Sequence, residues 1–279
     1  MNEEKFCNIK QNKELNAIAH TLPSKRQAAN FYSGQGYITP LGNFGVRIQI
    51  GLPDRNVTLG TSSHKLLDVL LNQCAKTGGR KIRFSVHAYK EMMGVSDYYN
   101  ARKRILQDMD ALFSLDIGIK DENGNFLRLR LMESYGLHNG TVCVELTPGF
   151  MELLRGCTVA PLPVGVLKIN SHKNPHSYYF GRKLSELIYI QKGNPCKIKI
   201  ENLIKSSPIM PSEEELKTNG NRNYVQRIMK PFIRDMEAMP DTIQYKYTYN
   251  GETISGPKLQ NMPYTEFKNV MVEAGFDMG

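Results

Sequence analysis

The chain has 279 residues, enough for one large domain or two of ordinary size, and its 41% hydrophobic and 23% charged residues are typical of a folded protein in water. No apolar run approaches the roughly 18–20 residues that span a bilayer, and the polar start "MNEEKFCNIKQNKEL" is unlike a signal peptide, so we expect a cytoplasmic protein. Lys and Arg exceed Asp and Glu by 36 to 27, and the formal charge of +9 favours a polyanionic partner.

Residues 1–61 are predicted to form an N-terminal extension. The stretch "VRIQIGLP" has the alternation of a short strand, and "HTLPSKRQAANFY" is a basic lead-in to the part of the chain that follows. Lys25, Arg26 and Arg47 suit either DNA contact or plain solvent exposure, and the second interpretation requires no partner.

Residues 62–160 show a regular order of secondary structure. Apolar residues recur every three or four positions in the expected helices and every second position in the expected strands. The dipeptide Asn-Gly beside β-prone stretches is the strongest short-range signal for a hairpin turn. In chain order the elements are a helix through Leu66–Gln73, a strand over Lys81–Ser85, a short helix over Val86–Gly94, a longer helix over Asp97–Leu115 with Ser96 as its N-cap, and a hairpin turning at Asn123-Gly124.

Residues 161–279 repeat this order. The clearest sign is the pair "DMDAL" and "DMEAM", which begin at Asp108 and Asp235, 127 positions apart. The hairpin turn at Asn123-Gly124 has a counterpart at the same offset, Asn250-Gly251. The copies differ by insertions in loops, the largest of them in "SSPIMPSEEELKTNGNRN". In chain order the second copy has a helix through Leu184–Gln191, a strand over Lys197–Glu201, a short helix over Glu201–Ser207, a longer helix over Asn221–Ala238 and a hairpin turning at Asn250-Gly251.

Each copy has the element order of a winged helix, in which the longer helix follows a turn and the hairpin is the wing. The sequence therefore predicts an α+β fold of two tandem winged-helix domains (helix-turn-helix plus β-hairpin wing), at residues 62–160 and 161–279, after the N-terminal extension. Basic residues in the wings are expected at DNA phosphates, although exposed strand edges also favour Lys and Arg. These wing residues are Arg128 and Arg130 in the first copy and Lys246 in the second.

The first longer helix is predicted to have one apolar and one polar face. Tyr98, Ala101, Ile105, Met109 and Leu112 recur at spacings of three or four residues and form the buried stripe. The opposite face carries amide and cationic side chains, which suit base edges because Arg pairs with guanine and Asn or Gln pairs with adenine. An ordinary solvated face is the alternative interpretation. The candidates for DNA contact on this helix are Asn100, Lys103, Arg104 and Gln107.

The second longer helix is predicted to be more cationic. Between Lys217 and Arg234 the sequence has five basic residues and no acidic one, a pattern that favours contact with phosphates and guanines. Pro231 removes a backbone donor and is expected to kink this helix, so that Lys230 and Arg234 point differently from Arg227. The expected apolar stripe is Val225, Ile228 or Met229, Phe232 and Met236. The candidates for DNA contact are Arg222, Asn223, Arg227, Lys230 and Arg234.

With two such domains in tandem, the chain resembles the twin winged-helix replication initiators of iteron-type, theta-replicating plasmids. The resemblance covers about Ser62–Tyr264 and rests on "SSHKLLDVLLNQ", "KIRFSVHAYKEMMGVSDYYNARKRILQDMDAL", "YYFGRKLSELIYIQKG" and "NRNYVQRIMKPFIRDMEAM". It implies a protein that binds repeated origin sequences in double-stranded DNA with both domains in successive major grooves, opens the origin and recruits host replication proteins. It also implies a homodimer that represses its own promoter and a monomer that initiates.

Signals for catalysis are weak. Nicking initiators use a tyrosine and a metal held by a His-hydrophobe-His pair, which none of the six histidines forms. Asn174-Pro175 breaks helical spacing between His172 and His176, the five cysteines include no C-x-x-C, and no Walker-type loop occurs. Tyr98-Tyr99 and Tyr178-Tyr179 are expected to pack against their helices. We therefore expect no enzyme activity, no metal and no cofactor, with two alternatives left open: a winged-helix transcriptional regulator without an initiator role, and a nicking initiator.

Overall fold

The chain divides into two compact units. The computed structural model describes residues 6–11, 37–41, 46–51, 60–120, 126–155, 158–220 and 223–277. The N-terminal unit comprises Asn8–Ala160, and the C-terminal unit comprises Pro161–Gly279 together with Met1–Cys7. A two-stranded sheet of β1 (Phe6–Gln11) and β9 (Thr158–Pro163) involves the segments in which the chain passes from one unit to the other. Within the described ranges, no helix is long and apolar enough to cross a bilayer.

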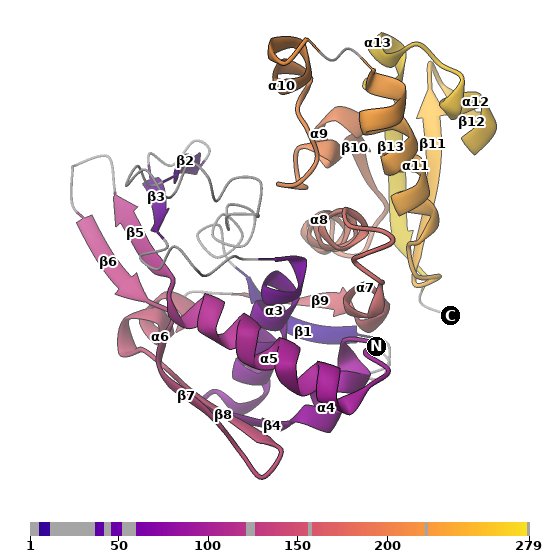
Figure 1. Ribbon diagram of the computed structural model, residues 1–279. Coiled ribbons are helices and arrows are strands. Elements are labelled where there is room, and N and C mark those ends of the chain that lie inside the picture. The colour runs from indigo at the N-terminus through magenta and orange to yellow at the C-terminus, as the bar shows by residue number, and fades with distance from the viewer. Residues whose placement is uncertain are drawn as a thin grey trace. The chain divides into compact units, whose positions relative to one another are not determined.

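Three helices and a three-stranded sheet form the core of the N-terminal unit (Figure 1). The sheet has the antiparallel order β4-β8-β7, and both α3 and α4 contact α5, which lies across β7. Leu66, Leu70 and Ile105 are buried between these layers, as the helical spacing predicts. The elements are α3 (Thr61–Thr77), β4 (Lys81–Ser85), α4 (Val86–Met92), α5 (Tyr98–Phe113), β7 (Met132–His138), β8 (Thr141–Leu146) and α6 (Pro148–Arg155).

The predicted longer helix of this unit is confirmed with two corrections at its start. Ala101, Ile105, Met109 and Leu112 are buried as predicted, but Tyr98 is 38% exposed. Tyr98 is the first helical residue, so no preceding turn of helix covers it. The N-cap is Asp97 and not Ser96, since Asp97 Oδ2 accepts a hydrogen bond of 2.6 Å from the backbone N–H of Asn100.

The hairpin predicted at Asn123-Gly124 forms, but it is not the wing of the N-terminal unit. Its strands β5 (Asp116–Lys120) and β6 (Phe126–Arg130) pair with each other in a separate four-stranded sheet, and the turn itself lies outside the described residues. The hairpin whose strand pairs with β4 is β7–β8. It turns at Asn139-Gly140, where φ is 48° and 72°, as a tight hairpin turn requires. The wing of this unit is therefore β7–β8.

The separate sheet also contains the strand predicted in "VRIQIGLP". Its order is β2-β3-β5-β6, all antiparallel, with β2 at Tyr37–Leu41 and β3 at Val46–Gly51. Arg47 belongs to β3, while Lys25 and Arg26 lie outside the described residues. This sheet adds four strands that the winged-helix order does not need.

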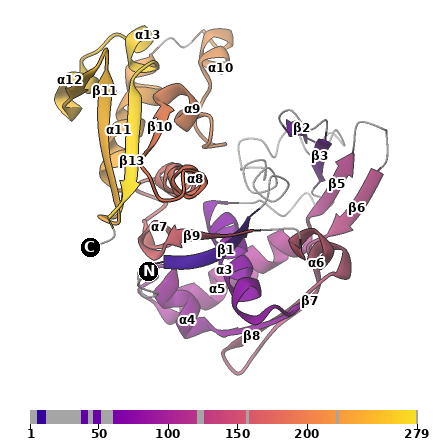
Figure 2. The ribbon, with the colours of Figure 1, turned by 180° about the vertical axis from the view of Figure 1, so that it is seen from behind.

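The C-terminal unit repeats the order helix, strand, short helix, longer helix and sheet (Figure 2). Its sheet has the antiparallel order β10-β13-β11-β12, and α8 contacts both β10 and β13. The predicted turn at Asn250-Gly251 is confirmed, with φ of 50° and 83°. The elements are α7 (Val164–Lys168), α8 (Ser177–Ile190), β10 (Cys196–Lys199), α9 (Ile200–Ile204), α10 (Glu213–Thr218), η2 (Val225–Met229), α11 (Lys230–Glu237), β11 (Ile243–Tyr249), β12 (Glu252–Ile254), α12 (Gly256–Gln260), α13 (Tyr264–Phe267) and β13 (Met271–Phe276).

The longer helix of this unit begins as the π-helix η2 and continues as α11. The backbone N–H of Lys230 donates to the carbonyl of Val225, five residues earlier. In an uninterrupted α-helix the ring of Pro231 would press on the carbonyl of Arg227, and the wider turn relieves that clash. The turn also changes the phase of the helix, so that Val225, which the α-helical spacing places in the core, is 40% exposed. The rest of the predicted stripe is buried: Ile228, Met229, Phe232 and Met236.

Candidate nucleic-acid interface

The polar face of α5 in the N-terminal unit is exposed at three of its four predicted positions. Asn100, Lys103 and Gln107 lie in solvent, with their helix held at its start by Asp97. Arg104 is half-buried, and its charge acts on the buried groups Asp108 and Lys65. On this face the amides of Asn100 and Gln107 and the ammonium group of Lys103 are therefore exposed to solvent, while Arg104 is half-buried.

A buried polar cluster lies beneath α5. Asp108 Oδ1 accepts hydrogen bonds of 2.8 Å from the hydroxyls of Ser62 and Ser63, and its Oδ2 accepts one of 3.3 Å from Tyr89. Burial raises the pKa of Asp108, while these hydrogen bonds and Arg104 act in the opposite direction. Burial, with a smaller contribution from Arg104, lowers the pKa of Lys65 to about 7. Arg104 therefore helps to balance buried charge, a structural role that the sequence pattern did not reveal.

The wing residues predicted for the N-terminal unit do not lie on its wing. Arg128 and Arg130 belong to β6, and Arg130 is exposed, whereas the Arg128 side chain lies outside what the structure describes. The β7–β8 hairpin has no Lys or Arg between Met132 and Leu146. Its turn presents His138 and Asn139, so DNA contact by this wing would rely on polar groups other than Lys and Arg.

The longer helix of the C-terminal unit exposes Asn223, Arg227 and Lys230, while Arg222 lies outside the described residues. Asn223 caps the helix, since its Oδ1 accepts a 3.2 Å hydrogen bond from the backbone N–H of Gln226. In the described part of the chain, Arg227 and Lys230 form no ion pair. These two cations are therefore available to an external anion, while the amide of Asn223 is partly used by its own helix.

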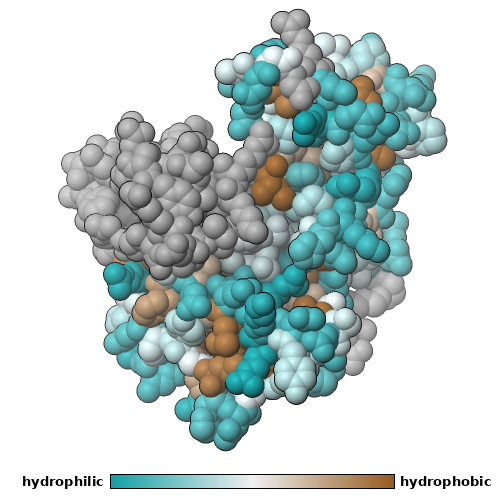
Figure 3. All heavy atoms as spheres, viewed as in Figure 1, coloured by the Kyte–Doolittle hydropathy of each residue, from teal (hydrophilic) through white to brown (hydrophobic). Residues whose placement is uncertain are grey.

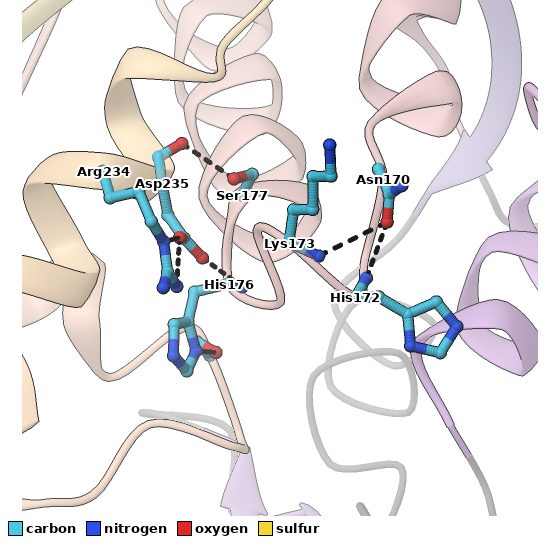
Figure 4. A network of polar contacts seen from close by, with 8 residues as sticks. Asn170, His172, Lys173, His176, Ser177, Arg234 and Asp235 are labelled. Carbon is cyan, nitrogen blue, oxygen red and sulfur yellow. Dashed lines mark hydrogen bonds and ion pairs between the residues drawn. The ribbon is translucent and has the colours of Figure 1, made fainter.

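Arg234 is held by its neighbour. Its Nε and Nη2 lie 2.8 Å and 2.7 Å from Asp235 Oδ1, and the carboxylate is fully buried (Figure 4). The other carboxylate oxygen accepts a 2.6 Å hydrogen bond from the backbone N–H of His176. Ser177 Oγ donates to the backbone carbonyl of Asp235 over 2.8 Å. Arg234 thus compensates a buried charge, although its side chain remains 51% exposed toward solvent.

This network shifts the pKa values of its members. Burial raises the pKa of Asp235, with the hydrogen bond from His176 and the charge of Arg234 opposing it. Burial, with a smaller contribution from Arg234, lowers the pKa of His176 to about 4. The ring Nδ1 of His176 lies 2.9 Å from Ser207 Oγ. His176 is therefore a neutral core residue at the start of α8, in agreement with the loop predicted between His172 and α8. Among the described residues, no group of three or more His, Cys, Asp or Glu is placed to hold a metal ion.

A groove runs beside the longer helix of the C-terminal unit. It encloses about 400 Å³, and the face that carries α11 and α12 is largely hydrophilic (Figure 3). Gln226 and Gln260 line this groove with Lys230 and Arg234, but Arg227 does not. Lys230 and Arg234 therefore share a groove that Arg227 does not line. Gln226, three residues after Asn223 and four before Lys230, was not among the predicted contacts, although α-helical spacing places it at the edge of the cationic face.

Two further predicted positions differ from expectation. Lys246, predicted as a free wing cation, lies in β11 with its Nζ 3.5 Å from Glu273 on β13. Tyr178 and Tyr179 pack in the core as predicted, but Tyr99 is 78% exposed. The expectation that Tyr98-Tyr99 packs against its helix is therefore wrong, because both residues lie in the first turn of α5 and no preceding turn covers them.

Two helix-turn-helix units with hairpin wings, each exposing amides and cations on its longer helix, define a twin winged-helix DNA-binding protein. The chain belongs to the family described as "Initiator Replication protein, WH1", whose model matches residues 8–158, more than half of its length. It is therefore a replication initiator that binds DNA.

Its fold is similar to crystal structures of domains 2 and 3 of RctB. A selenomethionine derivative gives a TM-score of 0.53 at 11% identity, over 95% of this chain and 99% of the other. A second structure, of RctB residues 155–483, gives a TM-score of 0.53 at 12% identity, over 94% and 96%. At these identities the likeness concerns the fold alone. No curated protein matches the chain.

Proposed function

We propose that the protein initiates replication of a plasmid or other mobile element by binding repeated sequences in its origin as double-stranded DNA and promoting origin opening. The observation that carries this proposal is the repetition of one DNA-binding architecture within a single chain. Each unit offers a longer helix with exposed amide and cationic side chains. Two recognition helices in one chain suit a site that extends over two successive segments of major groove.

The exposed groups divide into base-reading and phosphate-binding types. Arg227 suits bidentate contact with guanine, and the amides of Asn100 and Gln107 suit adenine. Lys103 and Lys230 suit either a phosphate or a guanine edge. Arg234 contributes less to recognition than the sequence predicts, because it forms an ion pair with the buried Asp235. Arg104 also contributes less, because its side chain is half-buried.

Footprinting on the DNA that flanks the gene tests the proposal. We expect protection of several similar sequences in tandem, and we expect a fragment with these repeats to support replication of a plasmid that lacks its own origin when the protein is supplied. Protection of one operator without origin activity would contradict the initiator function and favour the transcriptional regulator.

We infer that the protein does not cut DNA itself. Tyr178 and Tyr179 are buried and cannot reach a phosphodiester, and the sequence has no His-hydrophobe-His pair. Of the two tyrosine pairs considered for nicking, Tyr98-Tyr99 includes the most exposed side chain, Tyr99 at 78%. Incubation of supercoiled origin DNA with the protein and Mg²⁺ or Mn²⁺ should leave the DNA uncut, and a covalent adduct that the Tyr99→Phe variant loses would contradict this inference.

The proposal includes a homodimer that represses the promoter of its own gene, a monomer that initiates, and host replication proteins as partners. The family resemblance supports these features. Light scattering of the free protein and of its complex with one repeat gives the stoichiometry directly. One chain per repeat in the complex and two chains in the free protein are expected, and a monomer in both states would remove the dimer from the proposal.

A further inference from the structure

The groove beside the longer helix of the C-terminal unit has two walls, which come from different segments of the chain. One wall is a stripe of η2 and α11, and the other is α12, which lies in the segment between β12 and β13. The stripe consists of Gln226, Lys230, Pro231, Ile233, Arg234 and Glu237, and the opposite wall consists of Gly256, Pro257 and Gln260. A winged helix needs only a hairpin at this point in the chain, so the second wall is an addition to the fold.

Core contacts fix this second wall in place. Leu259 of α12 and Phe267 of α13 are fully buried, and α12 contacts α11. Tyr264 of α13 stacks on Tyr224 at the start of the longer helix, with ring centroids 4.5 Å apart and an interplanar angle of 12°. The groove is therefore preformed and does not depend on a movement of the hairpin.

The polar groups of the groove favour an anion. Lys230 is exposed and unpaired within the described part of the chain, so it is the main cation of the groove. Arg234 lines the groove with a side chain that is 51% exposed, but its charge is shared with the buried Asp235. Gln226 and Gln260 each add an amide donor. Lys258, next to Pro257 on α12, is also exposed, and its Nζ lies 3.8 Å from Glu252. Glu237 is the acidic residue of the lining and lies at the C-terminal end of the stripe.

We propose that this groove holds the sugar–phosphate backbone of one DNA strand while the same helix places Arg227 in the adjacent major groove. This inference rests on the proposed DNA-binding function and assigns it an additional phosphate site. A helix in the major groove is flanked by phosphates, and lysine, arginine and glutamine side chains are common phosphate ligands. Pro231, Ile233 and Pro257 provide apolar surface for the deoxyribose. The volume of about 400 Å³ is large enough to hold a segment of backbone.

Gly256 allows a direct test, because it lines the groove and a Cβ added there meets no atom within 4 Å. Gly256→Lys adds a cation to the wall, Gly256→Glu adds an anion, and Gly256→Gln adds bulk without charge. We expect Gly256→Lys to tighten binding to an origin fragment and Gly256→Glu to weaken it, each by several-fold. The slope of log K against log salt concentration should steepen for Lys and flatten for Glu by about 0.9, the value for one phosphate contact.

Lys197→Ala is the matched control. It changes the net charge by the same amount as Gly256→Glu, its side chain is 61% exposed, and its Nζ lies 3.7 Å from Glu273 on the solvent face of the sheet. We expect a much smaller change in affinity for this variant. An equal effect of Lys197→Ala and Gly256→Glu would show that only total charge matters and would overturn the proposal.

Opposite effects of Gly256→Lys and Gly256→Glu support the phosphate site. Equal losses in both variants, or no change in either, overturn it, provided that circular dichroism shows a native fold. If Gly256→Glu misfolds, Gln260→Glu on the exposed end of α12 takes its place, with the same weakening expected. A wild-type protein that binds no origin DNA would instead refute the proposed function. Arg227 lies outside the groove, so Arg227→Ala shows the effect of losing base recognition while the phosphate site is intact.

Discussion

Ser63 donates a hydrogen bond of 2.8 Å from its hydroxyl to Oδ1 of the buried Asp108, and this contact joins the start of α3 to α5. The C-terminal unit has a corresponding contact, in which Ser177 at the start of α8 donates to the backbone carbonyl of Asp235 over 2.8 Å. Asp108 and Asp235 begin the two nearly identical pentapeptides of the sequence. In both units the repeated aspartate therefore links the helix at the start of the repeat, α3 or α8, to the longer helix.

Replacing Asp108 tests the importance of this contact. Asp108→Ala removes the acceptor of Ser62, Ser63 and Tyr89, so the free energy of unfolding should fall by about 1–3 kcal/mol. Asp108→Asn keeps an acceptor oxygen and should cost less. Urea titration of both variants measures the difference. Equal stability of Asp108→Ala and wild type would show that the contact does not hold α3 to α5.

Replacing Arg227 and replacing Arg234, both on the longer helix of the C-terminal unit, should have different effects on DNA affinity and on stability. Arg227→Ala should weaken DNA binding by about 1–3 kcal/mol and relax the preference at one base position, if the contact is bidentate. Its free energy of unfolding should stay unchanged because Arg227 forms no ion pair in the described part of the chain. A uniform loss of affinity on every sequence would show that Arg227 contacts phosphate only.

Arg234→Ala should instead lower stability, because it leaves the buried carboxylate of Asp235 without its cation. The side chain of Arg234 is half exposed, so we expect about 1–2 kcal/mol, measured by urea unfolding. A stable Arg234→Ala variant with a large loss of DNA affinity would reverse the roles assigned to the two arginines.

The helical stripes were largely predictable from the sequence, because burial on a helix follows the local period of 3.6 residues. Ile105, Met109 and Phe232 are buried as that period requires. Val225 was wrongly predicted to be buried, because the π-turn ahead of Pro231 changes the phase of the helix locally and the apolar pattern does not show this change. The ion pair of Arg234 with the buried Asp235 and the partial burial of Arg104 also have no local signal, since both depend on the residues packed beneath the helix.

The wing of the N-terminal unit could not be assigned by the same reasoning. Asn123-Gly124 and Asn139-Gly140 are both Asn-Gly dipeptides, but the sequence prediction rests on the first alone, whose offset matches Asn250-Gly251. Which hairpin joins β4 depends on pairing between strands that are distant in the sequence. In the structure β4 pairs with β8, so the second signal marks the wing. The local sequence therefore indicates where a hairpin turns but not which strand the hairpin pairs with.

His176 predicts a pH dependence of stability. Its pKa is about 4 in the folded chain, against an ordinary value of 6.5, so the unfolded chain binds a proton more readily between these values. Stability from this group is complete above about pH 6.5 and is lost toward pH 4, by on the order of 3 kcal/mol. Asp108 and Asp235, with raised pKa values, act in the opposite direction. The difference between the wild-type and His176→Gln unfolding curves isolates the histidine, and parallel curves would contradict its low pKa.

The phase of α5 predicts opposite outcomes for two neighbouring substitutions. Met109→Asp places a charge in the core of the N-terminal unit and should unfold it, since burial of an unpaired charge costs several kcal/mol. Leu106→Asp, on the exposed side of the same helix at 36% exposure, should be tolerated. Circular dichroism and thermal unfolding distinguish the two. A folded Met109→Asp variant would show that the orientation of α5 is wrong.

The most direct test of the whole account is a hydroxyl-radical footprint on a single origin repeat. Wild type should protect two segments about one helical turn, roughly 10 base pairs, apart. Arg227→Ala should lose protection at one segment only, and a Lys103→Ala, Gln107→Ala double variant should lose it at the other. If both variants weakened the same segment, or if one segment alone were protected, the claim that each unit places its own helix in the duplex would be contradicted.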